Sequence, residues 1–204
     1  MDFQNLNTLQ RDVLKEIGNI GSGNAATALS TMLNRKINMG VPNVSILPFP
    51  QVIEILGGPE TLVAGSYLQV EGEAPMSILF VLPEESINLF LGILIGEREL
   101  EGKGLDELSA SAIKEVTNIL AGSYLTALSV LTNMDFSQSV PSLAYDMVGA
   151  ILGNVLQLYG EISDYALIID TMFIEGDKKV QGHLFLLPEP GSLETLFEQL
   201  GVVS

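Results

Sequence analysis

The sequence has no cysteine and only one histidine among its 204 residues. The absence of cysteine excludes disulfide bonds, thiolate nucleophiles and zinc sites built on sulfur, and it is typical of the reducing cytoplasm. Apolar runs such as residues 87–95 are shorter than the roughly 20 residues that a membrane-spanning helix needs. The first five residues also lack the basic and apolar regions of a secretion signal. We therefore expect a cytoplasmic protein without membrane insertion.

Basic residues are scarce as well. Nine lysines and arginines stand against 25 aspartates and glutamates, and the formal net charge is −16. Such a charge repels nucleic acids and anionic membrane surfaces over about one Debye length, so we expect no nucleic-acid partner. Charged residues make up only 17% of the chain and hydrophobic residues 47%. This balance predicts a compact globular protein, not a disordered one.

An internal repeat is the most informative feature that the sequence does contain. Two sets of four residues recur at a constant spacing of 99 residues (118 − 19, for example): Asp12, Glu16, Asn19 and Pro42, and then Ser111, Glu115, Asn118 and Pro141. The first three positions of each set have the spacing i, i+4, i+7, which places them within about 60° of one another on one face of a helix. We expect repeats of about 1–100 and 101–204 that together form one domain, 1–204.

The ends of the two site-bearing helices carry matching signals. Residues suited to helix caps stand at equivalent positions: Asn7, Gln10 and Asn34 in the first repeat, and Asp106 and Asn133 in the second. Asn7 with Gln10 has the spacing of a capping box, and asparagine tolerates the left-handed conformation at a helix end. We therefore predict helices over residues 8–33 and about 107–131.

The segments between these helices predict hairpins and shorter helices. Alternating and β-branched residues indicate hairpins over 62–82 and 165–187, and the run 79–84 recurs at 184–189. Short strands are expected on either side of Pro42 and Pro141, and further helices over 51–56, 83–95, 146–158 and 192–200. Hairpins favour antiparallel pairing, so we expect an α+β fold. Its two halves would be related by a pseudo-twofold axis, with the two long helices packed on antiparallel sheets.

The repeated polar face could be no more than a solvated helix surface, which is the usual fate of helical Asp, Glu and Asn. Its retention in two otherwise diverged halves argues for a function. The full pattern is Asp or Ser, three residues, Glu, two residues, Asn, twenty-two residues and Pro, and it resembles the CheC/CheX/FliY family of chemotaxis response-regulator phosphatases. The flanking residues 15–21 and 24–28 also resemble the first helix of that family.

The resemblance implies hydrolysis of the aspartyl phosphate on a CheY-type response regulator. It implies catalytic roles for Glu16, Asn19, Glu115 and Asn118, and supporting roles for Asp12, Pro42, Ser111 and Pro141. Asparagine suits this chemistry because a carboxamide can accept from an attacking water and donate to the phosphoryl group. The glutamates are implied to pair with the regulator's lysine. The regulator would bring Mg²⁺, so we expect no cofactor or metal site in this chain.

A second implied partner is CheD, the receptor-modifying deamidase. The segment around Asp146 resembles the part of the family that makes this contact, although Asp146 also reads as the N-cap of the following helix. An alternative function therefore stays open at this stage. The protein could be mainly a regulatory binding module that controls CheD or CheY-P and has little phosphatase activity.

Two other features predict structural roles. Residues 21–26 match a G-x-G-x-x-A dinucleotide motif, but that motif must begin a helix, and here a capped helix is already under way. The small residues are better explained by the close approach of a neighbouring helix or partner. His183 has no carboxylate or serine partner suggested by spacing, so we expect a structural or surface histidine. Asp170 is expected to be a solvated charge.

Overall fold

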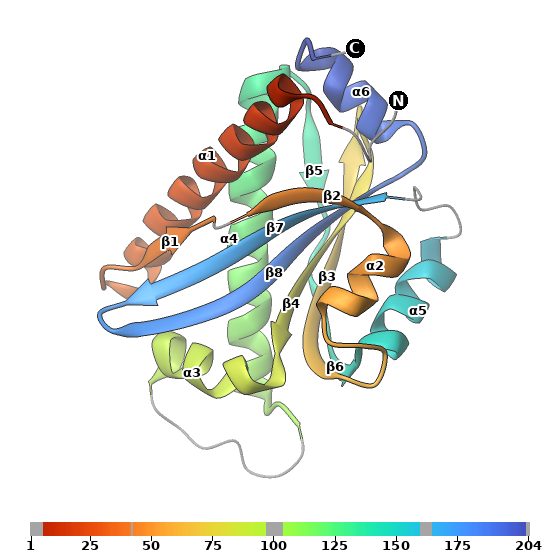
Figure 1. Ribbon diagram of the computed structural model, residues 1–204. Helices are drawn as coiled ribbons and strands as arrows, with labels where there is room; N and C mark the ends of the chain where they lie inside the picture. The colour runs from red at the N-terminus through yellow and green to blue at the C-terminus, as the bar shows by residue number, and fades with distance from the viewer. Residues whose placement is uncertain (1–5, 42, 97–103, 160–164, 203–204) are drawn as a thin grey trace.

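The computed structural model describes residues 6–41, 43–96, 104–159 and 165–202 (Figure 1). Within these residues, every helix is too short or too polar to pass through a lipid bilayer. The elements follow in chain order: α1 (Thr8–Leu33), β1 (Asn38–Gly40), β2 (Val44–Pro48), α2 (Phe49–Ile55), β3 (Leu62–Gly72), β4 (Met76–Pro83), α3 (Glu84–Ile95), α4 (Glu107–Thr132), β5 (Phe136–Gln138), β6 (Ser142–Met147), α5 (Val148–Tyr159), β7 (Tyr165–Glu175), β8 (Lys178–Pro188) and α6 (Ser192–Gln199).

The strands of the described chain form one eight-stranded sheet with the order β1-β7-β8-β4-β3-β5, and β2 also pairs with β7 and β6 with β3. All of these pairings are antiparallel, as the hairpin pattern predicts. The central pair joins β4 to β8, which are the strands that contain the repeated apolar run. The pseudo-twofold axis passes between them, and the α+β prediction is confirmed. The repeat boundary expected near residue 100 lies outside the described residues.

The two repeats exchange strands across this axis. β1 and β2 of the first repeat pair with β7 of the second, while β5 and β6 of the second pair with β3 of the first. A side-chain contact adds to the exchange, because the Tyr145 hydroxyl on β6 donates to Glu84 on α3. This hydrogen bond raises the pKa of the Tyr145 phenol. Each repeat therefore depends on the other to complete its sheet edge.

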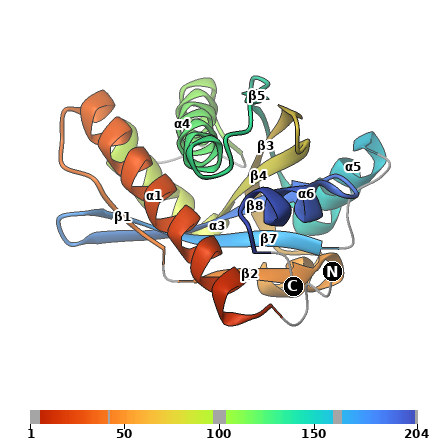
Figure 2. The same cartoon turned by 90° about the horizontal axis from the view of Figure 1, so that it is seen from above.

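Helices cover both faces of the sheet. One core packs α1, α3, α4 and α6 against the strands, and a second core packs α2 and α5 against the opposite face. Figure 2 shows α4 nearly end-on above β7 and β8. Residues 76–82 of β4 are all buried, because successive side chains enter opposite cores. The sequences of the central strands are therefore continuous apolar runs and not alternations of apolar and polar residues.

The predicted ends of the long helices are confirmed. Asn7 and Gln10 form a reciprocal capping box at α1, with both nitrogen-to-oxygen distances at 2.9 Å. The Asp106 carboxylate accepts from the Ser109 amide at 2.8 Å and caps α4. Asn34 and Asn133 end the helices in the left-handed conformation, with φ of 49° and 57°. These caps satisfy backbone groups that the helix itself leaves unpaired, so both helices begin and end at repeat-equivalent positions.

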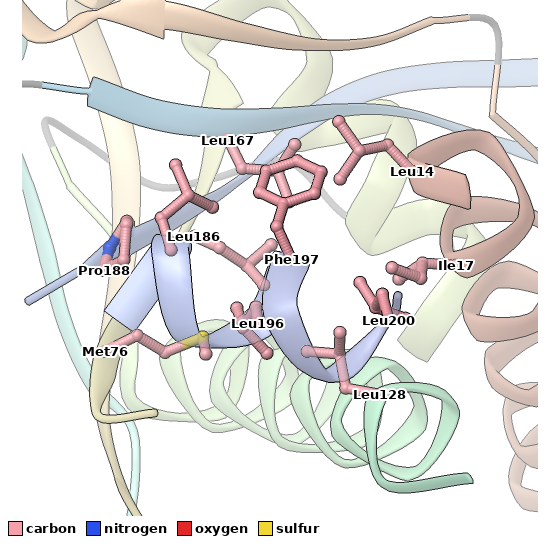
Figure 3. Close-up of a pocket in the computed structure, with 11 residues that line it drawn as sticks. Leu14, Ile17, Met76, Leu128, Leu167, Leu186, Pro188, Leu196, Phe197 and Leu200 are labelled. Carbon is pink, nitrogen blue, oxygen red and sulfur yellow. The ribbon is translucent and has the colours of Figure 1, made fainter. Parts of the chain in front are cut away.

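The helix α6 closes one end of the larger core. Figure 3 shows Phe197 and Leu200 next to Leu14 and Ile17 of α1, around a small apolar space. Its volume is about 20 Å³, and apolar side chains line it. A space of this size could hold one water molecule but offers it no polar partner, so it is a packing void and not a ligand site.

Candidate functional site

The two site-bearing helices pack directly against each other. Gly21 of α1 lies beneath the ring of Tyr124 of α4, so that a Cβ atom on Gly21 would stand 2.3 Å from Tyr124 Cδ1. Tyr124 is fully buried, and burial raises the pKa of its phenol. The prediction that small residues in α1 allow a neighbouring helix to approach is therefore confirmed at Gly21. The repeat is not symmetric here, because the position equivalent to Gly21 is Leu120.

The first polar face points outward from α1. Asp12, Glu16 and Asn19 are all exposed, whereas Leu14 and Ile17 between them are buried in the core. In the parts of the chain that the structure describes, the three polar side chains make no hydrogen bond or ion pair with one another or with other residues. The face is therefore free to meet groups supplied by another molecule.

Two valines, one directly after β1 and one at the start of β2, lie beside this face. A Cβ atom on Gly18 would stand 3.0 Å from Val44 Cγ2 and 3.2 Å from Val41 Cγ1, so both valines pack on α1 next to Asn19. Pro42, the fourth residue of the first predicted set, lies outside the described residues.

The second polar face forms one wall of an open pocket. The structure brings all four residues of the second predicted set together there, because the segment after β5 folds back over α4. The pocket has a volume of about 250 Å³ and is lined by Ser111, Lys114, Glu115, Asn118, Gln138, Ser139, Val140 and Pro141. Ser111 and Glu115 are exposed, Asn118 is partly buried and Pro141 is buried. Pro141 is therefore the least accessible of the four residues.

Gln138 is a pocket residue that the sequence pattern does not reveal. Its Nε2 atom donates to Asn118 Oδ1 at 2.7 Å and approaches the backbone oxygen of Asn118 at 3.2 Å. The repeat offset places Met39 at this position in the first half, and a thioether cannot donate a hydrogen bond. Because Gln138 is not repeated, the comparison of the two halves gives no signal for it.

The first half of the chain holds this pocket wall in place. Ser139 donates its amide to the backbone oxygen of Gln69 on β3 at 2.8 Å, and its hydroxyl accepts from the Gln69 amide at 2.9 Å. The second polar face thus consists of a helix from one repeat and a strand segment that is fixed to the other repeat. Among the described residues, no group of three or more His, Cys, Asp or Glu is placed to hold a metal ion.

Asp146 lies apart from both polar faces, at the end of β6. It is exposed, and its carboxylate accepts from the Met147 amide at 2.7 Å. The helix α5 begins at Val148, whose amide donates to the backbone oxygen of Thr61 at 2.9 Å. The prediction that Asp146 is the N-cap of this helix is therefore wrong, because a backbone carbonyl of the first repeat takes the role.

His183 has a carboxylate partner that its sequence context does not predict. Asp170 and His183 stand opposite each other on β7 and β8, with Nδ1 and Oδ1 2.8 Å apart. The histidine is buried, as expected for a structural residue. The expectation that Asp170 is only a solvated charge is wrong, because the cross-strand pairing brings the two side chains together. Both belong to a different open pocket, which the N-terminal end of α3 also lines.

Comparisons with known proteins agree with this arrangement. The profile of the CheC-like family matches residues 9–46 and 108–145, which include the polar helix face and the following strands of each repeat. The CheY-P phosphatase CheC of Bacillus subtilis is 38% identical over 203 residues, covering 98% of this chain and 97% of that protein. The flagellar motor switch phosphatase FliY of the same organism is 32% identical over 144 residues, covering 69% of this chain and 36% of its own length.

Solved structures share the fold. Thermotoga maritima FliY superposes with a TM-score of 0.71 at 23% identity, covering 96% of this chain and 98% of that one. A chain of the FliG–FliM complex from H. pylori superposes with a TM-score of 0.69 at 10% identity, covering 95% and 100%. The sequence identity to a relative over nearly the full length, together with the repeated profile match, decides the family. The chain belongs to the CheC-like family.

Proposed function

We propose that this protein is a phosphatase that hydrolyses the aspartyl phosphate of a phosphorylated CheY-type response regulator in chemotaxis signalling. The observation that carries the proposal is the pair of outward-facing Glu and Asn side chains on α1 and α4. The 38% identity to a CheY-P phosphatase over almost the whole chain also supports the proposal. The catalytic residues that we propose are Glu16, Asn19, Glu115 and Asn118.

Each asparagine would position the attacking water. The reaction breaks the bond between phosphorus and the aspartyl oxygen while a water oxygen attacks from the opposite side, so alignment and charge stabilisation supply most of the catalysis. The carboxamide oxygen of Asn19 or Asn118 would accept a hydrogen bond from that water, and the amide nitrogen would donate to the phosphoryl group. Because a carboxamide does not titrate near neutral pH, this role is independent of the solution pH.

Each glutamate would dock the regulator. A carboxylate beside a phosphoryl group is repelled unless a cation lies between them, and the lysine near the regulator's phosphorylated aspartate would supply that cation. Glu16 and Glu115 are exposed, so they can reach such a partner without first breaking a buried interaction. Mg²⁺ would be held by the regulator, and Asp12, Ser111 and the two prolines would shape the two sites.

A phosphate-release assay tests the proposal. Purified protein is mixed with a phosphorylated CheY-type regulator and Mg²⁺, and the loss of phosphate is followed over time. We expect release to accelerate with increasing protein concentration. The unphosphorylated regulator serves as the control and yields no phosphate. If decay of the phosphorylated regulator is unchanged at saturating protein, the phosphatase proposal is wrong, and a binding module without hydrolytic activity is the remaining reading.

Reversal of charge at the two glutamates tests the docking step. In a Glu16→Lys, Glu115→Lys variant, two lysines would face the regulator's own lysine, and we expect binding to weaken by about thirtyfold, or ~2 kcal/mol. Alanine at both positions should weaken binding less, because it removes attraction without adding repulsion. Surface plasmon resonance or titration calorimetry with the phosphorylated regulator measures the effect.

A matched control variant carries the same change in net charge at two other positions. Glu54 and Glu60 are exposed residues of α2 and the following loop, outside the two polar faces. A Glu54→Lys, Glu60→Lys variant should bind the regulator as well as the wild type does. Equal weakening in both lysine variants would mean that net charge, and not a specific pairing at Glu16 and Glu115, governs docking.

A contact with a CheD-type deamidase is a second proposal, and the surface around Asp146 supports it. Asp146 and Met147 are both exposed, and Asp146 is not required as the cap of α5. We expect the two purified proteins to elute together in gel filtration and an Asp146→Lys variant to elute alone. Co-elution that survives this substitution would place the contact elsewhere.

A further inference from the structure

We propose that Gln138 is a positioning residue of the second site, which holds the carboxamide of Asn118 in one orientation, and that the first site lacks an equivalent. The inference rests on the proposed phosphatase function and adds a difference between its two sites. The second site would be pre-organised before the regulator binds. Each of its turnovers would therefore be faster than a turnover at the first site.

The hydrogen-bond geometry fixes the orientation of both amides. Gln138 Nε2 faces two oxygen atoms of Asn118, the side-chain Oδ1 at 2.7 Å and the backbone oxygen at 3.2 Å. A carbonyl oxygen at the Nε2 position would face both acceptors without a hydrogen to share, so the nitrogen must stand there. The same contact requires that the atom of Asn118 nearest to Gln138 is the oxygen and not Nδ2.

Gln138 is itself confined by its surroundings. It pairs with Val70 in the β3–β5 ladder, and its amide lies over Gly122 of α4, where a Cβ atom would be 3.7 Å from Gln138 Oε1. Oε1 is buried and has no hydrogen-bond partner among the residues that the structure describes. An unpaired buried oxygen disfavours the folded state, so stability alone does not explain this glutamine.

The fixed orientation matters for the chemistry proposed for Asn118. Oδ1 has two lone pairs, so one can accept from Gln138 while the other accepts from the attacking water. Both hydrogens on Nδ2 remain available for the phosphoryl oxygens. Without Gln138, rotation of the carboxamide by 180° would exchange its donor and acceptor and give an unproductive arrangement. Loss of Gln138 would therefore lower the rate of hydrolysis in the bound complex and leave the affinity for the regulator unchanged.

Among the residues that the structure describes, the first site offers no such donor. The repeat offset places Met39 at the position of Gln138, and the next residue of β1 is Gly40, which has no side chain. Asn19 is exposed, and its side chain makes no hydrogen bond to any described residue. The two sites therefore differ in the freedom of the asparagine on which the proposed mechanism depends.

Kinetics with one site inactivated test this inference. In an Asn19→Ala background only the second site remains, and there we expect Gln138→Met to lower kcat by about tenfold with little change in KM. Gln138→Glu keeps the shape of the side chain and removes the donor, so it should lower kcat at least as far. If the Gln138→Met variant fails to fold, the Gln138→Glu variant still tests the role of the donor. Thermal melting verifies that each variant is folded.

Two controls separate positioning from a general structural role. In an Asn118→Ala background only the first site remains, and Gln138→Met should leave its kcat unchanged. Gln181→Met makes the same substitution at an exposed residue of β8 and should leave both sites unchanged.

Each remaining outcome has a defined meaning. A wild-type protein without activity would overturn the proposed function and this inference with it. If the wild type and the Asn19→Ala variant are active but both Gln138 variants keep full kcat, only the role of Gln138 is wrong. A second site that is slower than the first, or a change in KM alone, would also overturn the inference.

Discussion

Replacing Asn19 and Asn118 together by alanine is expected to reduce phosphate release from a phosphorylated CheY-type regulator by about a hundredfold or more, while the protein stays folded. The proposed mechanism places the attacking water through these two amides, and an alanine side chain can neither accept a hydrogen bond from that water nor donate one to the phosphoryl group. Each single variant should lose only the contribution of its own site. The initial rate of phosphate release at saturating regulator measures all three variants.

The stability of these variants should be close to that of the wild type. Asn19 is exposed, and Asn118 is partly buried, with a side chain that is hydrogen-bonded to Gln138 and to no other described residue. Loss of one such hydrogen bond costs about 1 kcal/mol, which is too little to unfold a protein of this size. Exposed helical asparagines outside the two faces, Asn88 and Asn154, provide matched controls that should keep full activity. If the loss of activity merely follows the loss of thermal stability, Asn19 and Asn118 have a structural role and not a catalytic one.

Replacing Gly21 by alanine is expected to destabilise the fold by about 2 to 4 kcal/mol. The added methyl group would stand 2.3 Å from Tyr124 Cδ1 and 2.6 Å from Cε1, far inside van der Waals contact. Tyr124 is fully buried, so its ring cannot move aside into solvent. Alanine gains about 1 kcal/mol of helix propensity over glycine, and this gain is too small to offset the clash. Chemical denaturation measures the difference.

The same helix supplies the control for this substitution. Gly23 is exposed, and a Cβ atom there meets nothing within 4 Å, so Gly23→Ala should stabilise the protein by up to about 1 kcal/mol. A double-mutant cycle adds a second check, because Gly21→Ala should be less destabilising when Tyr124 is replaced by leucine. Equal stability of the Gly21→Ala and Gly23→Ala proteins would show that the packing of α1 on α4 is not the constraint that we infer.

Local chemistry and repetition allow much of this protein to be predicted from its sequence. The capping residues Asn7 and Asp106 fix where the long helices begin, and the left-handed Asn34 and Asn133 fix where they end. Helical periodicity then places the Asp or Ser, Glu and Asn positions on one face without any tertiary information. Turn residues and alternating patterns likewise predict the two hairpins, because both signals are contained within short stretches of chain.

The tertiary structure alone decides which segments from distant parts of the chain meet. A repeated sequence is compatible with strands paired within each half or between halves, and the structure pairs β1 and β2 with β7, and β5 and β6 with β3. Because of that exchange, the strand segment that carries Gln138 lies beside Asn118. The segment and the helix together line the pocket at the second polar face. Gly21 against Tyr124 is a contact of the same kind. Such contacts have no period or fixed spacing in the sequence, because the burial and hydrogen bonding of the whole sheet determine them.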